Sequence, residues 1–171
     1  SRNPFSRAVD FANFSLCQIE ERQERPICTA TFAIRKEVFD QTSGFDESLK
    51  VHEDIDYCHR LEDAGYRTVY QPKVRVIHDH GRETFGALVR YLFYAGNLGG
   101  LQIERRYREQ VSAYKALLKF DNPALYALMV LPFALAATLR TLLANFNAHR
   151  HVVALAPLIF AGKLSCHIGI L

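Results

Sequence analysis

The stretch Val51-His52-Glu53-Asp54-Ile55-Asp56-Tyr57-Cys58-His59-Arg60-Leu61 places three carboxylates within four positions, directly before an apolar-periodic segment that ends at Gly65. Acidic side chains are tolerated at the entrance of a helix, because the first turn offers free N–H groups and a partial positive charge. The pattern therefore predicts a helix over residues 54–64 with Gly65 as its C-terminal stop. Its expected buried side chains are Ile55, Cys58 and Leu61.

The three carboxylates have two interpretations. In the first, Asp54 or Asp56 caps the helix and has no further role. In the second, a carboxylate held at this positive end of the helix serves as a base toward a ligand in a cleft. The segment by itself favours capping, and the rest of the chain supplies the arguments for chemistry.

The composition is that of a folded protein from a reducing compartment. Among 171 residues, 49% are hydrophobic and 23% are charged, which is enough to build a core. The net charge is only +3, and no basic stripe interleaved with aromatic residues points to nucleic acid as a partner. The four cysteines are widely spaced without a CxxC pair, which excludes a zinc ribbon and a disulfide framework. The chain starts at Ser1 without a signal-peptide pattern, and we expect it to begin inside a longer protein.

Helices and strands are expected to alternate along residues 1–103. Gly44 suits a position with positive φ after a short helix. This alternation predicts an α/β layout, with too few strands to close a sheet alone. The expected elements are a helix at 5–19, a loop at 20–25, strands at 27–34, 66–70 and 74–78, a helix at 35–41, and a helix that starts at Thr84, carries the stripe Phe85, Leu88, Val89, Leu92 and Ala95 or Gly96, and is interrupted at Gly99-Gly100.

A second group of polar side chains follows the last of these strands. His78 and His80 share one face of an extended chain, and Asp79 lies on the other. Imidazole is a common ligand of divalent metals and a good donor to phosphate. The two histidines are therefore candidate ligands, although a histidine at a strand end is more often structural.

The C-terminal third of the chain is apolar. Residues 124–147 carry only Arg140, residues 152–171 carry only Lys163, and the polar connector 147–151 separates them. Two such stretches of about 20 residues are typical of a membrane hairpin, and the alternative is a pair of buried helices in a soluble domain. Each stretch contains a proline that would kink its helix.

A basic amphipathic helix is predicted just before this hairpin, at residues 104–121. Its apolar stripe is Tyr107, Val111, Tyr114 and Leu118, with five basic side chains at the other positions. Such a helix can lie at an anionic cytoplasmic leaflet, and the alternative is an ordinary solvated surface helix. The expected organisation is a domain at 1–103, this helix, and a membrane-associated hairpin at 122–171.

Three landmarks stand in order along the chain. They are Thr31–Phe39 running into Ser43-Gly44-Phe45-Asp46-Glu47, the helix His52–Tyr66, and Val74–His78. Together they resemble the C-terminal half of family 2 glycosyltransferases with the GT-A fold, over residues 26–100. The resemblance implies a fold class of α/β, a partial GT-A domain followed by C-terminal apolar helices.

The resemblance also implies roles for particular residues. Asp54 matches the catalytic base, and Glu53 precedes it as a group that orients the acceptor or the base. His78 matches a histidine that binds the divalent metal (Mg²⁺ or Mn²⁺) or the nucleotide diphosphate, and His80 is a weaker candidate for the same role. The acceptor-side wall matches Thr29 to Thr31 and the turn Ser43-Gly44-Phe45-Asp46.

The function implied is an inverting, hexosyltransferase-type enzyme on the cytoplasmic face of the cell membrane. It would move a sugar from a nucleotide-sugar donor to a glycan or lipid-linked acceptor, in cell-envelope or exopolysaccharide synthesis. Ser43 stands where the family usually has glycine. No Q..RW motif of processive synthases follows His78, which favours a non-processive transferase. The nucleotide-binding half with its DxD-type motif is absent from the chain, so we expect the chain alone to be inactive.

Two other functions remain open from the sequence. One is a metal-binding or hydrolytic module, although the spacing matches no HExxH-like pattern. Its ligands would come from His52, Asp54, Asp56, His59, His78 and His80. The other is a non-catalytic membrane-attached scaffold, against which the intact Glu53-Asp54 pair and His78 argue.

Overall fold

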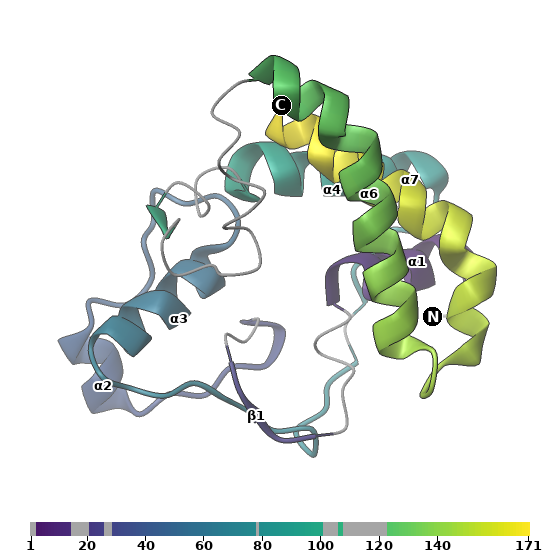
Figure 1. The fold of residues 1–171 in the computed structure, drawn as a ribbon. Helices are drawn as coiled ribbons and strands as arrows, with labels where there is room; N and C mark the ends of the chain where they lie inside the picture. Colours follow the sequence, from purple (N-terminus) through teal and green to yellow (C-terminus); the bar gives the residue numbers. More distant parts are fainter. Residues whose placement is uncertain (1–2, 15–20, 26–28, 78, 101–105, 108–122) are drawn as a thin grey trace. The chain divides into compact units, whose positions relative to one another are not determined.

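A computed structural model describes residues 3–14, 21–25, 29–77, 79–100, 106–107 and 123–171 (Figure 1). The chain forms two compact units, which are described separately. The motif unit is Cys17–His78, and the helical unit combines Ser1–Leu16 with Asp79–Leu171. The expected domain boundaries at residues 103 and 121 stay predictions.

The motif unit contains two helices, a short 3-10 helix and a small sheet. Strands β1 and β2 pair antiparallel, with Gln23 opposite Tyr70 and Glu24 opposite Val69. The elements are β1 Gln23–Glu24, η2 Thr29–Thr31, α2 Lys36–Gln41, α3 Glu53–Asp63 and β2 Val69–Tyr70.

Aromatic side chains build the core of this unit. Tyr57 of α3 is fully buried, and Val38 of α2 and Leu61 of α3 complete the buried cluster. The Phe45 ring lies 4.9 Å from the Tyr57 ring, between centroids. Large rings bury much apolar surface per residue, which suits a unit with little regular structure. The core joins α2, α3 and the turn between them.

Helix α3 confirms the prediction from the acidic stretch. Cys58 and Leu61 are buried, Ile55 is half-buried, and Gly65 follows the helix at φ +82°. The N-cap position is occupied by His52, at φ 62°, and not by Asp54 or Asp56, and the His52 side chain makes no capping hydrogen bond. Oδ1 of Asp54 does accept one of the N–H groups of the first turn, that of Ile55. Asp54 and Asp56 both lie inside the first turn of the helix.

The strand predictions are largely wrong. Residues 29–31 form a 3-10 helix and 32–35 are irregular, where a strand was expected at 27–34. Residues 74–77 are irregular with exposed apolar side chains, and the loop expected at 20–25 contains β1. An alternating pattern becomes a strand only when a partner completes its backbone hydrogen bonds. Within the described residues β1 and β2 are the pair that does so, and the expected α/β layout is mostly helical with little sheet.

The turn after α2 confirms the prediction of positive φ at Gly44. Ser43 and Gly44 both adopt the left-handed conformation, with φ of 59° and 61°. A Cβ atom at Gly44 would lie 2.7 Å from Cζ of Phe39. Gly44 is therefore required for two reasons, backbone conformation and close packing, whereas Ser43 bears the same conformation with a side chain.

Replacing Gly44 with alanine is expected to lower the free energy of unfolding by about 1–2 kcal/mol, through left-handed strain and the contact with Phe39. Gly65→Ala is the matched control, because φ is also positive there but nothing lies within 4 Å of the added Cβ. Ser43→Gly removes the left-handed strain of the folded chain but raises the conformational entropy of the unfolded chain. We expect the free energy of unfolding to rise by about 0.5 kcal/mol on balance. Urea unfolding followed by circular dichroism measures all three, since the chain has no tryptophan. Equal losses for Gly44→Ala and Gly65→Ala would contradict the packing argument.

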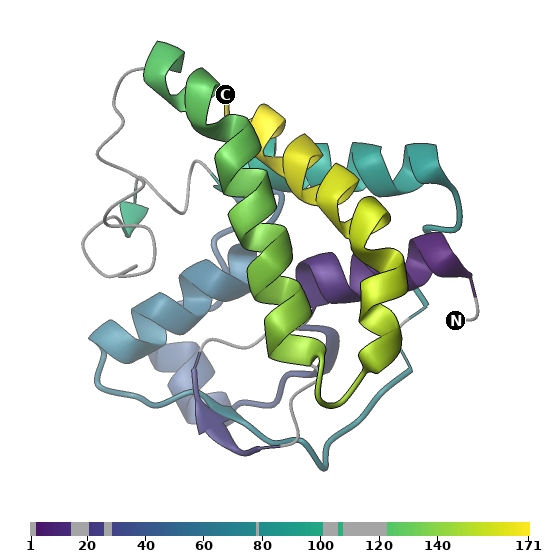
Figure 2. The same cartoon turned by 45° about the vertical axis from the view of Figure 1, so that its right-hand side comes forward.

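The helical unit contains the remaining elements (Figure 2). Asn3 starts α1, because its Oδ1 accepts hydrogen bonds from the backbone N–H groups of Phe5 and Ser6. Thr84 caps α4 as predicted, with Oγ1 accepting from the N–H of Ala87. The elements are α1 Pro4–Phe14, α4 Phe85–Tyr94, a π-helix η3 Ala95–Gly100, α6 Pro123–Asn145, a 3-10 helix η4 Arg150–Leu155 and α7 Ala156–Ile170.

The core of the helical unit lies between α1, α4 and the last helical segments. Its buried members are Ala8, Val9, Phe11, Ala12, Leu88, Leu92, Val152, Leu155 and Ile159. The predicted stripe of α4 is confirmed at Leu88, Leu92 and Ala95, while Phe85 is half exposed.

The two apolar stretches form helices as expected. Pro123–Asn145 and Arg150–Ile170 are each long and apolar enough to cross a membrane, by length and composition alone. The side chains of Thr138, Thr141 and Asn145 each donate a hydrogen bond to a carbonyl of α6 itself, at distances of 2.7–2.9 Å. The basic helix expected at 104–121 lies outside the described residues, apart from Arg106 and Tyr107.

Candidate functional site

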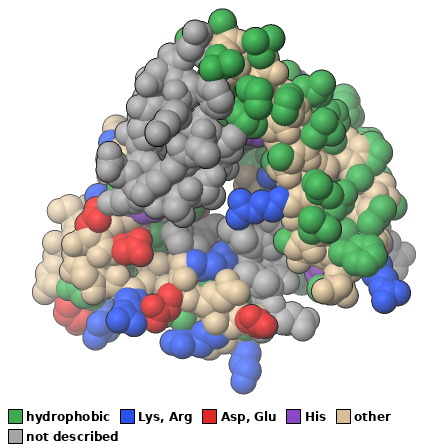
Figure 3. Space-filling view, in the orientation of Figure 1, with side chains coloured by type: hydrophobic (Ala, Val, Ile, Leu, Met, Phe, Trp, Pro, Cys, Tyr) green, Lys and Arg blue, Asp and Glu red, His purple; other side chains and the backbone are tan. Residues whose placement is uncertain are grey.

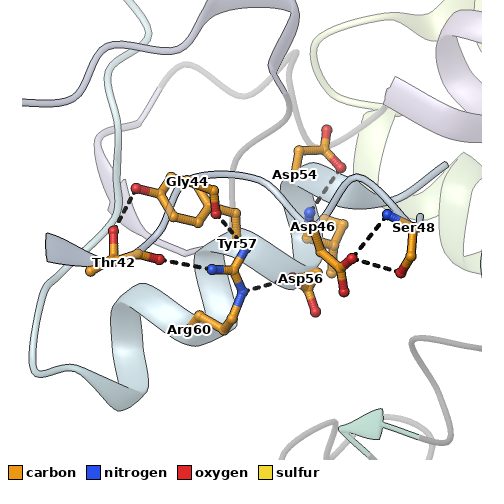
Figure 4. Close-up of polar contacts among 9 residues, drawn as sticks. Thr42, Gly44, Asp46, Ser48, Asp54, Asp56, Tyr57 and Arg60 are labelled. Atoms are coloured by element: carbon orange, nitrogen blue, oxygen red, sulfur yellow. Dashed lines mark hydrogen bonds and ion pairs between the residues drawn. The ribbon is translucent and has the colours of Figure 1, made fainter. Parts of the chain in front are cut away.

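The three carboxylates in the first turn of α3 differ in their surroundings, and Figure 4 shows two of them, Asp54 and Asp56. Asp56 is fully buried, and its Oδ2 accepts a hydrogen bond from Nε of Arg60 at 2.8 Å. Asp54 is half-buried, and its Oδ1 accepts from the backbone N–H of Ile55 at 2.8 Å. Glu53 is also half-buried. Asp56 is thus committed to an internal ion pair, whereas Asp54 and Glu53 keep contact with solvent.

Arg60 ties the turn after α2 to helix α3. Its Nη1 donates to the carbonyl of Thr42 at 3.0 Å, and its Nη2 donates to the carbonyl of Gly44 at 2.7 Å. The guanidinium also lies 4.9 Å from the centroid of the Tyr57 ring. The planar guanidinium therefore joins α3 to two backbone carbonyls of the turn, a geometry that suits arginine and not lysine.

The Tyr57 hydroxyl reinforces this connection through Thr42. The two hydroxyl oxygens lie 2.7 Å apart, and the Thr42 hydroxyl also donates to the carbonyl of Val38 at 2.7 Å. Sequence analysis did not single out Thr42, Tyr57 or Arg60. The spacing of Asp56 and Arg60, an acid four residues before a base, was a usable signal for this pair.

Asp46 organises the last part of the turn. Its Oδ1 accepts from the backbone N–H of Ser48 at 3.0 Å and from the Ser48 hydroxyl at 2.6 Å. Aspartate commonly shapes turns in this way, by bonding to the backbone two residues on. Asp46 therefore helps to set the path of the chain into α3, whatever it contacts in a substrate.

The other residues of the expected acceptor-side wall lie in the same unit. Gly44 is buried in the turn, and half-buried Phe45 packs on the core of the motif unit. Thr29 and Thr31 are both in η2, where Thr31 is half-buried. The motif unit thus holds Asp54, Glu53 and the whole expected wall, whose contact with an acceptor stays a prediction.

The candidate metal ligands are placed differently. His78 lies outside the described residues, and His80 belongs to the helical unit. Nδ1 of His80 accepts from the backbone N–H of Arg82 at 3.2 Å, and Nε2 lies 3.3 Å from Oδ1 of Asp10. The side chain is 1% exposed and stacks on Phe14. The argument that His78 and His80 share a strand face fails, because 74–77 is not a strand.

These surroundings do not suit a metal ligand. When a neutral histidine accepts an N–H at Nδ1, its own proton is on Nε2. In His80 this Nε2 faces the Asp10 carboxylate, so both ring nitrogens already have protein neighbours. No group of three or more His, Cys, Asp or Glu that could hold a metal ion occurs in the part of the chain that the structure describes. The described residues therefore do not fit a divalent cation, and no chemical step is derived through one.

Residues 6–93, about half of the chain, match the family described as glycosyltransferase like family 2. The chain belongs to this family. The match begins in α1, so it reaches further toward the N-terminus than the resemblance placed at residues 26–100. It contains α3 and its acidic first turn, the turn after α2, and most of α4.

Two similar proteins from Mycobacterium tuberculosis are glycosyltransferases by name. A "Pre-mycofactocin glycosyltransferase" is 35% identical over 75 residues, which are 44% of this chain and 16% of that protein. An "N-acetylglucosaminyl-diphospho-decaprenol L-rhamnosyltransferase" is 35% identical over 68 residues, which are 37% of this chain and 22% of that protein. The aligned segment is thus less than a quarter of either relative. No solved structure matches the chain.

Proposed function

We propose that the full-length protein is an inverting glycosyltransferase of family 2. It moves a sugar from a nucleotide-diphosphate donor to a hydroxyl of a glycan or lipid-linked acceptor. The observation that carries the proposal is the difference in surroundings between Asp54 and Asp56 of α3. Asp56 is buried against Arg60, and Asp54 is half-buried, one residue beyond the start of the helix. Family membership supports the transfer of a sugar as the reaction.

Asp54 is the base in this proposal. Its carboxylate accepts the proton of the acceptor hydroxyl while that oxygen attacks the anomeric carbon. The new carbon–oxygen bond forms on the face of the anomeric carbon opposite the nucleotide diphosphate. The bond between the anomeric carbon and the diphosphate oxygen breaks, and both of its electrons leave with the nucleotide diphosphate. The configuration therefore inverts. The N–H of Ile55 holds one carboxylate oxygen and fixes its direction. Glu53 orients the acceptor, and Thr29, Thr31, Gly44, Phe45 and Asp46 form the acceptor-side wall.

The acceptor is proposed to be lipid-linked. One relative is named for a diphospho-decaprenol acceptor, and two helices of this chain are long and apolar enough to cross a membrane. Both observations favour an enzyme at a membrane, and its proposed place is the cytoplasmic face of the cell membrane, in cell-envelope or exopolysaccharide synthesis. The need for Mg²⁺ or Mn²⁺ stays a prediction, with His78 as the proposed ligand.

The direct test is sugar transfer by the full-length protein in membranes. A panel of nucleotide sugars is offered with lipid-linked and water-soluble acceptors, with Mg²⁺, with Mn²⁺ and with a chelator. We expect one donor to be used on a lipid-linked acceptor, and the anomeric configuration of the product to be opposite to that of the donor. Retained configuration would rule out the single displacement by Asp54. Preference for a water-soluble acceptor would rule out the proposed acceptor class.

The 171-residue chain alone is expected to transfer no sugar under the conditions in which the full-length protein is active. The relatives are much longer than the aligned segment, and nothing in residues 1–25 supplies the acidic motif that the family uses for its donor. The same assay, run at equal protein concentration with a folded chain verified by circular dichroism, checks this. Robust transfer by the isolated chain would show that the donor site lies within it.

A further inference from the structure

The apolar helix α7 is enclosed along one side by helices of the family 2 segment. Val152, Leu155 and Ile159 pack in one core with Val9 and Phe11 of α1. Further along, Ser165 donates a hydrogen bond to the carbonyl of Val89 in α4 at 2.8 Å. The contacts thus run from the start of η4 to the end of α7, over the length that a bilayer would occupy.

Small residues bring α7 close to α4 and η3. A Cβ atom at Gly162 would lie 2.3 Å from Cδ1 of Leu92, and one at Gly169 would lie 2.2 Å from the carbonyl oxygen of Phe93. Nδ2 of Asn97 donates to the carbonyl of Gly169 at 3.1 Å. Contacts this close leave no room for lipid chains between α7 and the helices that cover it.

The covering helices carry charge. Arg7 and Asp10 are half-buried on α1, and Arg90 is exposed on α4. Most of each helix lies within residues 6–93, the segment that matches the family. A bilayer that α7 crossed would therefore have to accommodate these three charged side chains beside it, which is costly in hydrocarbon.

Helix α6 has a different outer surface. Its buried side chains, such as Val130, Phe133 and Ala134, lie on one face. The opposite face is a row of exposed leucines spaced by three or four residues, which we call the leucine face. Its members, with their exposed fractions, are Leu128 (76%), Leu131 (53%), Leu135 (55%), Leu139 (56%) and Leu143 (68%). Figure 3 shows hydrophobic side chains gathered over α6 and α7.

The segment that carries the leucine face contains basic residues but no acidic ones. Residues 122–171 contain no aspartate or glutamate, whereas Arg140 and Arg150 are exposed near the end of α6 and at the start of η4. Bare aliphatic side chains beside basic residues complement an anionic leaflet. Protein interfaces are instead enriched in aromatic residues and arginine at their centre.

We propose that the hairpin of α6 and α7 does not cross the membrane. It lies in the plane of one leaflet, with the leucine face among the acyl chains, Arg140 and Arg150 at the anionic headgroups, and α7 as a layer between α6 and the charged helices α1 and α4. Helix α6 has 23 residues, about 35 Å, which gives a long contact along the surface. This attachment is independent of the proposed sugar transfer.

The first experiment measures binding of the chain to vesicles of phosphatidylcholine, alone or mixed with phosphatidylglycerol. The triple variant Leu128→Asp/Leu135→Asp/Leu139→Asp is expected to lower the partition coefficient at least about 100-fold. The matched control is Val74→Asp/Val76→Asp/Ile77→Asp, which adds the same charge at exposed apolar positions of the motif unit and is expected to bind as the parent does. Arg140→Gln and Arg150→Gln should each weaken binding about fivefold, only with phosphatidylglycerol. Equal loss in the leucine variant and its control would overturn the proposal.

The second experiment distinguishes lying in the leaflet from crossing it. Ala124→Cys and Asn147→Cys place a thiol at either end of α6 in the full-length protein, in sealed inverted membrane vesicles. We expect a membrane-impermeant maleimide to label both, above the background of the parent cysteines. Labelling of one position only after detergent is added would show that α6 crosses the bilayer. A chain that ignores vesicles but forms a dimer, broken by the leucine variant in light scattering, would instead make the leucine face an interface between copies.

Discussion

Replacing Asp54 with asparagine is expected to lower sugar transfer by the full-length protein about 1,000-fold. A positioned general base typically contributes about 10²–10⁴ to the rate, and the amide cannot take the proton of the acceptor hydroxyl. The side chain keeps its size, and its oxygen can still accept the N–H of Ile55, so donor binding and folding should be retained. Steady-state transfer and donor binding, measured side by side in membranes, check both parts.

Asp40→Asn is the matched control for this experiment. Asp40 is an exposed aspartate of α2 in the same unit, and the contact that the structure gives it is a surface ion pair with Lys36 of the same helix. Such pairs contribute about 0.5 kcal/mol or less, and unchanged transfer is expected. Full activity in Asp54→Asn would remove Asp54 from the mechanism, and the transferase would then need another base. Loss of donor binding together with transfer would indicate a role in binding instead.

Replacing Arg60 with methionine is expected to destabilise the chain by about 3 kcal/mol. The substitution leaves the fully buried carboxylate of Asp56 without its ion pair and removes the donors to the carbonyls of Thr42 and Gly44. Removing one partner of a buried ion pair costs about 3–5 kcal/mol. Because the Arg60 side chain is 31% exposed, we expect a cost at the lower end of this range. Urea unfolding monitored by circular dichroism measures the change.

Three further variants show whether the buried charge is the cause. Arg67→Met removes an arginine whose pair with Glu24 is exposed, and a loss under about 1 kcal/mol is expected. Arg60→Lys keeps the positive charge but loses the planar fork, so it should fall between the parent and Arg60→Met. Removing both charges in Asp56→Leu/Arg60→Met should recover part of the stability. If the double variant is as unstable as the sum of the single ones, the ion pair is not the source of the effect.

Local patterns in the sequence predicted the helices well. Helix α3 follows from its acids, its apolar spacing and Gly65, and α4 follows from Thr84 and its leucines. Positive φ at Gly44 was also foreseen, because glycine after a short helix has a specific conformational use. These features depend on neighbours within a few residues, and a sequence contains that information directly.

Strands were predicted badly for the opposite reason. The segments 27–34 and 74–78 have the right alternation, but a strand depends on hydrogen bonds to a segment elsewhere in the chain. Val74, Val76 and Ile77 follow the alternating pattern, but they lie outside the strand pair of the described residues and their side chains are exposed. The argument that His78 and His80 share one face depended on the same strand and lost its basis, while His78 itself lies outside the described residues.

The sequence by itself determined the family, the acidic helix with Asp54 in its first turn, and the two apolar helices, because each is a pattern of residue types at fixed short spacing. Only the tertiary structure separated Asp54 from Asp56, since that difference comes from Arg60 and two carbonyls of a turn earlier in the chain. The tertiary structure also decided that α7 is covered by charged helices while α6 presents leucines outward. Hydropathy is alike along both helices, and burial depends on what packs against each face.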